Sequence, residues 1–221
     1  MNEKIIILDS SSIITINMIG MINVIEKLKK MFNVKFLITN NVYEEIVNVP
    51  LSIKKYAIRA LVVKELVEKK ILEIEKVDEK KVERILEKIN SMLEVENEKI
   101  KILHRGEASC IALYESLKTE KKVLCIDERT TRMVLENPES LKKLIENKIH
   151  KNIIMNKEIA KEFLEKKVKI IRSSELLYYA FKKNLIDLKD GKKVLEAILY
   201  ATKNYGCAIS EKEIERILSL S

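Results

Sequence analysis

Several residue types are scarce in this chain of 221 residues, and each shortage excludes a class of protein. Four glycines leave no glycine-rich loop of the kinds that bind nucleotide phosphates. The two histidines, His104 and His150, have no third partner at ligand spacing, which argues against a zinc site. Three widely separated cysteines predict buried free thiols rather than disulfides. Glutamine is absent and Lys, Glu and Ile are abundant, which indicates a thermophile, although the many asparagines point the other way.

Long apolar runs are also lacking, and none reaches the length of a membrane span. Asp9 and the serines that follow it interrupt the first apolar run, so we expect no signal peptide. Together with free thiols, this predicts a cytoplasmic protein without a membrane partner. The net charge of +8 suits a polyanionic substrate, but a solvated Lys/Glu surface explains the charge at least as well.

Four acidic residues are the most informative feature that is present. Asp9 and Asp127 each end an apolar run, Glu45 follows a second such run, and Glu107 opens a helical stretch. Because ligands bind at the carboxyl ends of parallel strands, we expect these four carboxylates to converge. Like charges a few ångströms apart cannot all ionise unaided, and a divalent cation removes the conflict. Oxygen ligands suit Mg²⁺ or Mn²⁺, so the four acids are candidate catalytic and metal-binding residues.

Neighbouring residues offer further roles, each with a structural alternative. Ser11 or Ser12 could orient a metal-bound water or a phosphate oxygen, or could simply cap the following helix. Glu128 is either a further metal ligand or a favourable charge at a helix N-terminus, and the second reading is preferred. Arg129 and Arg132 lie one turn apart where a phosphate should sit, so they are candidate substrate-binding residues or members of a solvated face.

Strands alternating with helices predict an α/β fold with a mostly parallel sheet and helices on both faces. No linker divides the chain, so residues 1–221 should form a single domain. Residues near 51–101 and 134–167 read as helical insertions. Asn41 and Glu44 have the spacing of a capping box, which would leave Glu45 for chemistry.

Three segments resemble the PIN domain family, a metal-dependent nuclease fold. They are residues 7–14 around Asp9, residues 38–46 around Glu45, and residues 103–113 followed by 124–129. Within that family the chain is similar to an archaeal and bacterial group of predicted nucleic-acid-binding proteins, whose members share tails like residues 171–181 and 205–210.

This resemblance implies a three-layer α/β/α fold, Mg²⁺ or Mn²⁺ at the four acids, and cleavage of single-stranded RNA. Ser11 matches the small polar residue of the family. The group is related to the toxin ribonucleases of toxin–antitoxin pairs, which implies an antitoxin-type protein partner. Either of the two insertions could form a lid, a homodimer surface or an RNA platform. The sequence therefore predicts a metal-dependent endoribonuclease. Two alternatives are a non-catalytic scaffold that binds RNA or protein and a metal-dependent phosphatase, and the basic composition disfavours the phosphatase.

Overall fold

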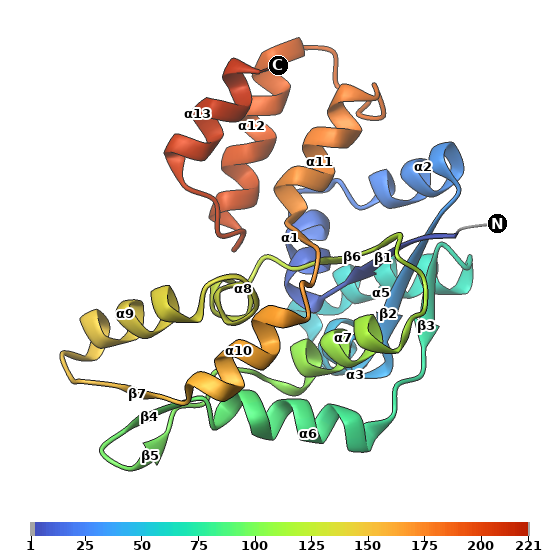
Figure 1. Ribbon diagram of the computed structural model, residues 1–221. Helices are drawn as coiled ribbons and strands as arrows, with labels where there is room; N and C mark the ends of the chain where they lie inside the picture. Colours follow the sequence, from blue (N-terminus) through green and yellow to red (C-terminus); the bar gives the residue numbers. More distant parts are fainter. Residues whose placement is uncertain (1–2, 221) are drawn as a thin grey trace.

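A computed structural model describes residues 3–220, so the two ends of the predicted domain, residues 1–2 and 221, lie outside it. In the described chain, five parallel strands form a central sheet in the order β3-β2-β1-β6-β8 (Figure 1). These strands are β1 (Lys4–Leu8), β2 (Val34–Thr39), β3 (Leu72–Glu75), β6 (Lys122–Cys125) and β8 (Ile170–Ile171). The helices are α1 (Ser10–Met18), α2 (Asn23–Phe32), α3 (Asn40–Tyr43), the π-helix η1 (Glu44–Asn48), α4 (Val49–Leu51), α5 (Lys54–Glu68), α6 (Glu79–Asn90), α7 (Arg105–Ser116), α8 (Arg129–Glu136), α9 (Pro138–Ile149), α10 (Lys157–Glu165), α11 (Ser173–Lys182), α12 (Gly191–Asn204) and α13 (Glu211–Ser219).

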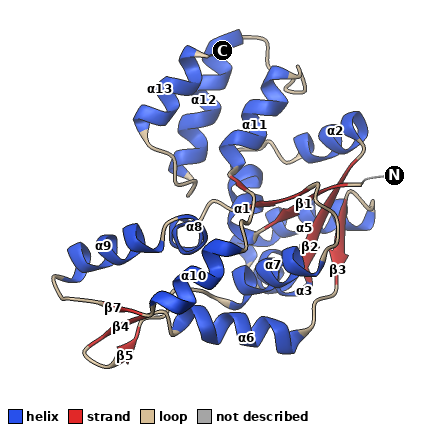
Figure 2. Cartoon of the chain, in the orientation of Figure 1, coloured by secondary structure: helices blue, strands red, loops and turns tan. Residues whose placement is uncertain are grey.

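Helices cover both faces of this sheet, which confirms the predicted α/β class (Figure 2). The connections β1–β2 and β2–β3 run in the same direction across the sheet, so right-handed crossovers place α1, α2 and α5 on one face. In agreement, α1 contacts α5, and α11 contacts both α1 and α2. The return from β3 to β6 runs through α6 and α7, and α7 packs on β1, β2 and β6 from the other face.

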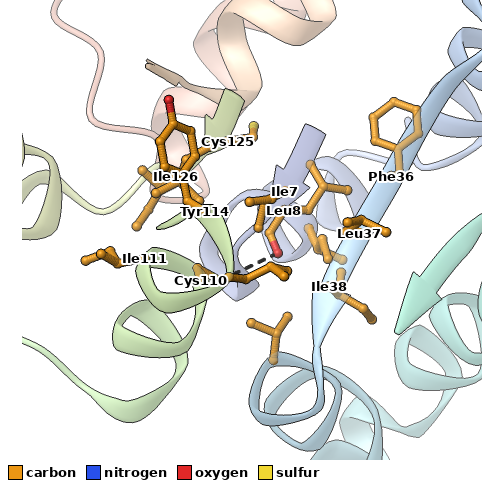
Figure 3. Close-up of a cluster of buried hydrophobic side chains, with 14 of the residues drawn as sticks. Ile7, Leu8, Phe36, Leu37, Ile38, Cys110, Ile111, Tyr114, Cys125 and Ile126 are labelled. Atoms are coloured by element: carbon orange, nitrogen blue, oxygen red, sulfur yellow. Dashed lines mark hydrogen bonds between the residues drawn. The ribbon is translucent and has the colours of Figure 1, made fainter. Parts of the chain in front are cut away.

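The central strands are apolar along their length because helices bury both of their faces. Ile7, Leu8, Phe36 and Ile38 are all completely buried. They share one buried cluster with Cys110 of α7, whose side chain points to Leu8 in the close-up of this core (Figure 3). Cys110 and Cys125 lie in the same cluster, and all three cysteines are free and buried, as predicted.

The two segments predicted as insertions meet each other in space. Residues 51–101 supply the edge strand β3 of the main sheet, as well as β4 (Leu93–Val95) and β5 (Glu98–Lys99). Strand β4 pairs antiparallel with β7 (Ile154–Met155), which belongs to the second segment. An ion pair of 2.8 Å between Lys88 and Glu162 joins the same two segments. The part of the first segment from α6 to β5 and the second segment from α9 to α10 therefore form one lateral extension, seen at the lower left of Figure 1.

Helix α3 starts differently from the prediction. Thr39, not Asn41, is the N-cap, and its hydroxyl accepts from the backbone N–H of Val42 at 3.1 Å. Glu44 instead accepts from the side-chain amide of Asn48 at 2.5 Å. The predicted capping box at Asn41 is wrong because α3 begins at Asn40, so its N-cap falls two residues earlier than that pattern implies. Glu45 is still left without a capping role.

The C-terminal helices α11, α12 and α13 form a second small core above the sheet (Figure 1). Arg172, just before α11, ties this lobe together by pairing with Glu175 and, at 2.9 Å, with Glu213 of α13.

Among residues 3–220, no single helix is long and apolar enough to cross a membrane; α1 and α2 together reach that length and composition but are bent by 111° at their junction.

Candidate active site

Asp9 and Asp127 leave neighbouring strands at the same edge of the sheet. Leu8 is in register with Cys125, and the backbone N–H of Asp9 donates to the carbonyl of Cys125 at 3.0 Å. The hydroxyl of Ser11 then links the two acids, since it donates to Asp9 Oδ2 at 2.6 Å and accepts from the backbone N–H of Asp127 at 3.1 Å. Ser11 therefore fixes the separation of the two strand ends.

Glu45 reaches this edge from the π-helix η1, where the helical turn is wider than an α-turn. Pro50 accounts for the wide turn, because it has no N–H to donate to the carbonyl of Ile46 and its ring crowds that carbonyl. The backbone N–H of Val49 bonds to Glu44 instead, five residues back. Single π-turns are frequent at functional sites because they redirect one side chain.

The carboxylate of Glu45 rests on the bare Cα of Gly106, at the start of α7. A Cβ built on Gly106 would lie 2.6 Å from Oε1 and 2.7 Å from Oε2 of Glu45, far inside van der Waals contact. Only glycine therefore allows Glu45 to occupy this place. Gly106 has an ordinary helical backbone, so the close approach, and not its conformation, requires the missing side chain.

Glu107 completes a group of three acids. Its Oε2 accepts from the backbone N–H of His104 at 2.9 Å, which closes a capping box at the start of α7. The thiol of Cys110, one turn further along α7, lies 3.8 Å from Asp9 Oδ1. Burial raises the pKa of this thiol well above its usual value, and the charges of Asp9, Glu45 and Glu107 raise it further. The charges of the three carboxylates thus all act on the same buried thiol.

Electrostatics within this group are unfavourable to full ionisation. Burial raises the pKa of Asp9 to about 6, and the charge of Glu107 adds to the rise, while hydrogen bonds from Ser11 oppose it. Burial likewise raises the pKa of Glu45, and the charge of Asp9 contributes. Burial raises the pKa of Glu107, and the charge of Glu45 raises it further. Hydrogen bonds from the backbone N–H groups of Glu107 and His104 lower this pKa but do not cancel the rise. A cation would relieve these three groups together.

Asp127 is oriented differently from the other three acids. It is completely buried, and its Oδ1 accepts from the backbone N–H of Ser173 at 2.7 Å while Oδ2 accepts from the Ser173 hydroxyl at 2.6 Å. Asp127 therefore binds the N-terminus of α11, 46 positions away in the chain. Its backbone lies beside Asp9, but its carboxylate is engaged by the C-terminal lobe.

Two of the predicted neighbours have structural roles. The hydroxyl of Ser12 is completely buried and donates to the carbonyls of Asp9 and Cys125, so it joins α1 to β6 and is not available to a substrate. The Glu128 carboxylate accepts from the backbone N–H of Thr131 at 2.5 Å. It caps α8, which is the preferred one of its two predicted roles, and its role as a metal ligand stays a prediction.

Arg129 and Arg132 line a polar cavity of about 410 Å³ close to Asp127, between α8 and the start of α13. Arg129 is exposed. Within the described chain, Nε of Arg132 is buried without a hydrogen-bond partner, and its Nη1 makes only a long bond of 3.4 Å to the carbonyl of Ala208. Its Nη2 pairs with Glu136 of the same helix at 3.3 Å, and Glu136 lines the same cavity.

A protein-family model for the PIN domain matches residues 5–140, more than half of the chain. The chain belongs to the PIN domain family. PIN domains are generally nucleases and typically use divalent metals. Neither the curated proteins nor the solved structures contain a significant match to this chain. The matched range holds all four predicted acids, whereas Ser173 and the C-terminal lobe lie beyond it.

The residues of this PIN domain fit a hard divalent cation by their chemistry, although no three His, Cys, Asp or Glu side chains of residues 3–220 stand in a ready-made ligand arrangement. Asp9, Glu45 and Glu107 supply only oxygen donors, the ligands that Mg²⁺ and Mn²⁺ prefer. The Glu45 carboxylate occupies the space next to the Gly106 Cα, where every other residue would place its Cβ.

The sequence did not reveal every residue that shapes the site. A hydrogen bond from the Ser10 side chain lowers the pKa of Glu45, and Ser173 binds Asp127. Gly106 lies in the segment 103–113 that resembles the PIN family, but its contact with Glu45 depends on the meeting of η1 and α7. Ser173 gave one usable signal, since it follows a short strand and begins a helix two residues before Glu175.

Gly106→Ala should lower the rate of a nuclease reaction at this site by about tenfold or more while leaving the fold intact. The new methyl group displaces Glu45, and misplacing a catalytic group by about 1 Å can cost on the order of 100-fold. Alanine favours helix by about 1 kcal/mol over glycine, so the melting temperature should not fall. The Glu45→Ala variant provides the control: adding Gly106→Ala to it should cause no further loss, because the two residues act as one unit. Independent, multiplying losses would contradict this interpretation.

Proposed function

We propose that this protein is a metal-dependent endoribonuclease that cleaves single-stranded RNA. The observation that carries the proposal is the group of three carboxylates, Asp9, Glu45 and Glu107, gathered at the carboxyl edge of the sheet around Gly106. Their mutual repulsion is costly unless a cation binds there. A Mg²⁺ or Mn²⁺ ion bound by these residues would supply an activated water and would shield the charge of the phosphate.

The protein residues contribute position and charge. Ser11 orients Asp9 through its hydroxyl and its backbone N–H, and Gly106 seats Glu45. Asp127 anchors α11 through Ser173, and its carboxylate would add negative charge at the same edge of the sheet as a bound ion. Arg129 and Arg132, which line one cavity, would bind a neighbouring phosphate of the RNA backbone.

A second candidate function is a PIN-type scaffold that binds RNA without cutting it. One observation favours it: both oxygens of Asp127 are occupied by Ser173. The carboxylate of the fourth acid is then a structural group. This candidate predicts RNA binding that does not require metal and no cleavage under any condition.

The deciding experiment incubates the purified protein with a labelled single-stranded RNA and millimolar Mn²⁺ or Mg²⁺. We expect internal cleavage that EDTA abolishes, and no cleavage of the same RNA annealed to its complement. Metal that binds only the native state also raises the melting temperature, by an amount equivalent to about 2.7 kcal/mol at 100 times Kd. Glu98→Gln, a change in an exposed residue of β5 in the lateral extension, serves as the matched control. RNA binding without cleavage at any metal concentration would establish the scaffold instead.

A further inference from the structure

A second cavity, of about 390 Å³, lies directly beside the candidate active site. It is formed by α1, η1 and α5 together with Tyr205, and Glu45 is part of its wall. Most of its other lining residues are apolar, among them Ile14, Ile46 and Val63. One cavity wall thus carries a residue of the acidic group, while the rest can accept a flat apolar group. We call this cavity the α1–α5 pocket.

Hydrogen bonds from α1 hold the walls of the α1–α5 pocket in place. The side-chain amide of Asn17 donates to the carbonyl of Arg59 at 3.0 Å, and the Arg59 guanidinium donates back to the carbonyl of Asn17. The hydroxyl of Thr15 donates to the carbonyl of Tyr205 at 3.2 Å, which attaches the end of α12 to α1. The pocket is therefore preorganised, and a ligand need not spend binding free energy on ordering it.

Two tyrosines from distant parts of the chain line this pocket and remain partly open to solvent. Tyr56 is 43 % exposed and Tyr205 is 47 % exposed. The ammonium group of Lys55 lies 4.6 Å from the centroid of the Tyr56 ring, and Lys54 beside it is exposed. Aromatic rings on which bases stack, flanked by cations that follow the backbone, are the usual means of binding single-stranded nucleic acids.

We propose that the α1–α5 pocket is a subsite for one unstacked base of the single-stranded RNA. Tyr56 and Tyr205 provide the stacking surfaces, and the adjacent phosphate is directed towards Glu45. This inference rests on the proposed function, because the RNA whose bond lies at the acidic group is the occupant. The pocket volume is at the low end of small-ligand sites, which favours a single planar group over a docked helix.

Affinity for RNA in EDTA tests the subsite without any contribution from cleavage. The probe is a short labelled single-stranded RNA of mixed sequence, measured by fluorescence anisotropy. Tyr56→Leu and Tyr205→Leu should each weaken binding about tenfold, since stacking on one aromatic ring contributes to affinity on this scale. Tyr56→Phe and Tyr205→Phe keep the ring and should bind like the wild type. Tyr200→Leu, which changes an exposed tyrosine outside the pocket, is the matched control.

The outcomes separate this inference from the proposed function. If the wild type binds RNA through both tyrosines but never cleaves it with Mn²⁺, the subsite stands and the nuclease activity does not. If it cleaves RNA and the leucine variants bind as tightly as the wild type, the subsite is refuted. No RNA binding by the wild type also refutes it. A leucine variant that changes the oligomeric state in size-exclusion chromatography, with RNA affinity unchanged, identifies the pocket as a contact between two copies of the chain.

Discussion

Asp9→Asn should slow RNA cleavage by about 100-fold or more, because electrostatic groups at the reacting centre supply the largest single contribution to catalysis. The same change should raise the melting temperature of the metal-free protein. Asp9 is completely buried, and burial together with the charge of Glu107 disfavours its ionised form. Asparagine has nearly the same shape, and its side-chain oxygen can still accept from Ser11, so the variant loses a buried negative charge without leaving a cavity.

Two calorimetric measurements at neutral pH check this prediction, one in EDTA and one in excess Mn²⁺. In EDTA the variant should melt at a higher temperature than the wild type. In Mn²⁺ the wild type should gain stability and the variant should gain much less, because one ligand is lost. Asp78→Asn is the control, because it makes the same change at a residue that caps the start of α6 and does not belong to the acidic group. Equal metal-induced shifts in the wild type and Asp9→Asn would show that the cation binds elsewhere.

Asp127→Ala should lower the free energy of unfolding by about 2–4 kcal/mol, because a buried polar group left without a partner costs about 1–3 kcal/mol. The change removes both acceptors of Ser173, whose backbone N–H and hydroxyl are buried at the start of α11. For a chain of this length, the loss corresponds to a fall in melting temperature of roughly 5–15 °C. Asp127→Asn retains an acceptor oxygen and should unfold almost like the wild type.

The pair of variants also separates anchoring from chemistry. Asp127→Asn should retain the fold but cleave RNA about 100-fold more slowly, because it removes a negative charge at the same edge of the sheet as Asp9. Ser173→Ala, which keeps the backbone N–H bond to Asp127, should lose only about 1 kcal/mol. Wild-type cleavage by Asp127→Asn would show that Asp127 serves only to hold α11, and that three acids complete the site.

Local patterns in the sequence were enough to predict the class of fold. Apolar runs of strand length separated by helical stretches predict a parallel sheet because each pattern depends on neighbouring residues only. Asp9 and Asp127 follow apolar runs directly, so their place at one edge of the sheet follows from strand direction alone. The free, buried state of Cys110 and Cys125 was predictable for the same reason, since both lie within apolar elements.

Only the tertiary structure decided how the acidic side chains are used. The contact of Glu45 with Gly106 requires η1 and α7 to meet, and no spacing in the sequence encodes that approach. The capture of Asp127 by Ser173 depends on where the C-terminal lobe docks and on the rotamer that its buried hydrogen bonds select. Likewise, β4 and β7 pair across more than fifty residues, which joins the two predicted insertions into one extension. Contacts between distant segments are set by packing of the whole chain, so the sequence identified the acids, and the fold determined which of them face one another.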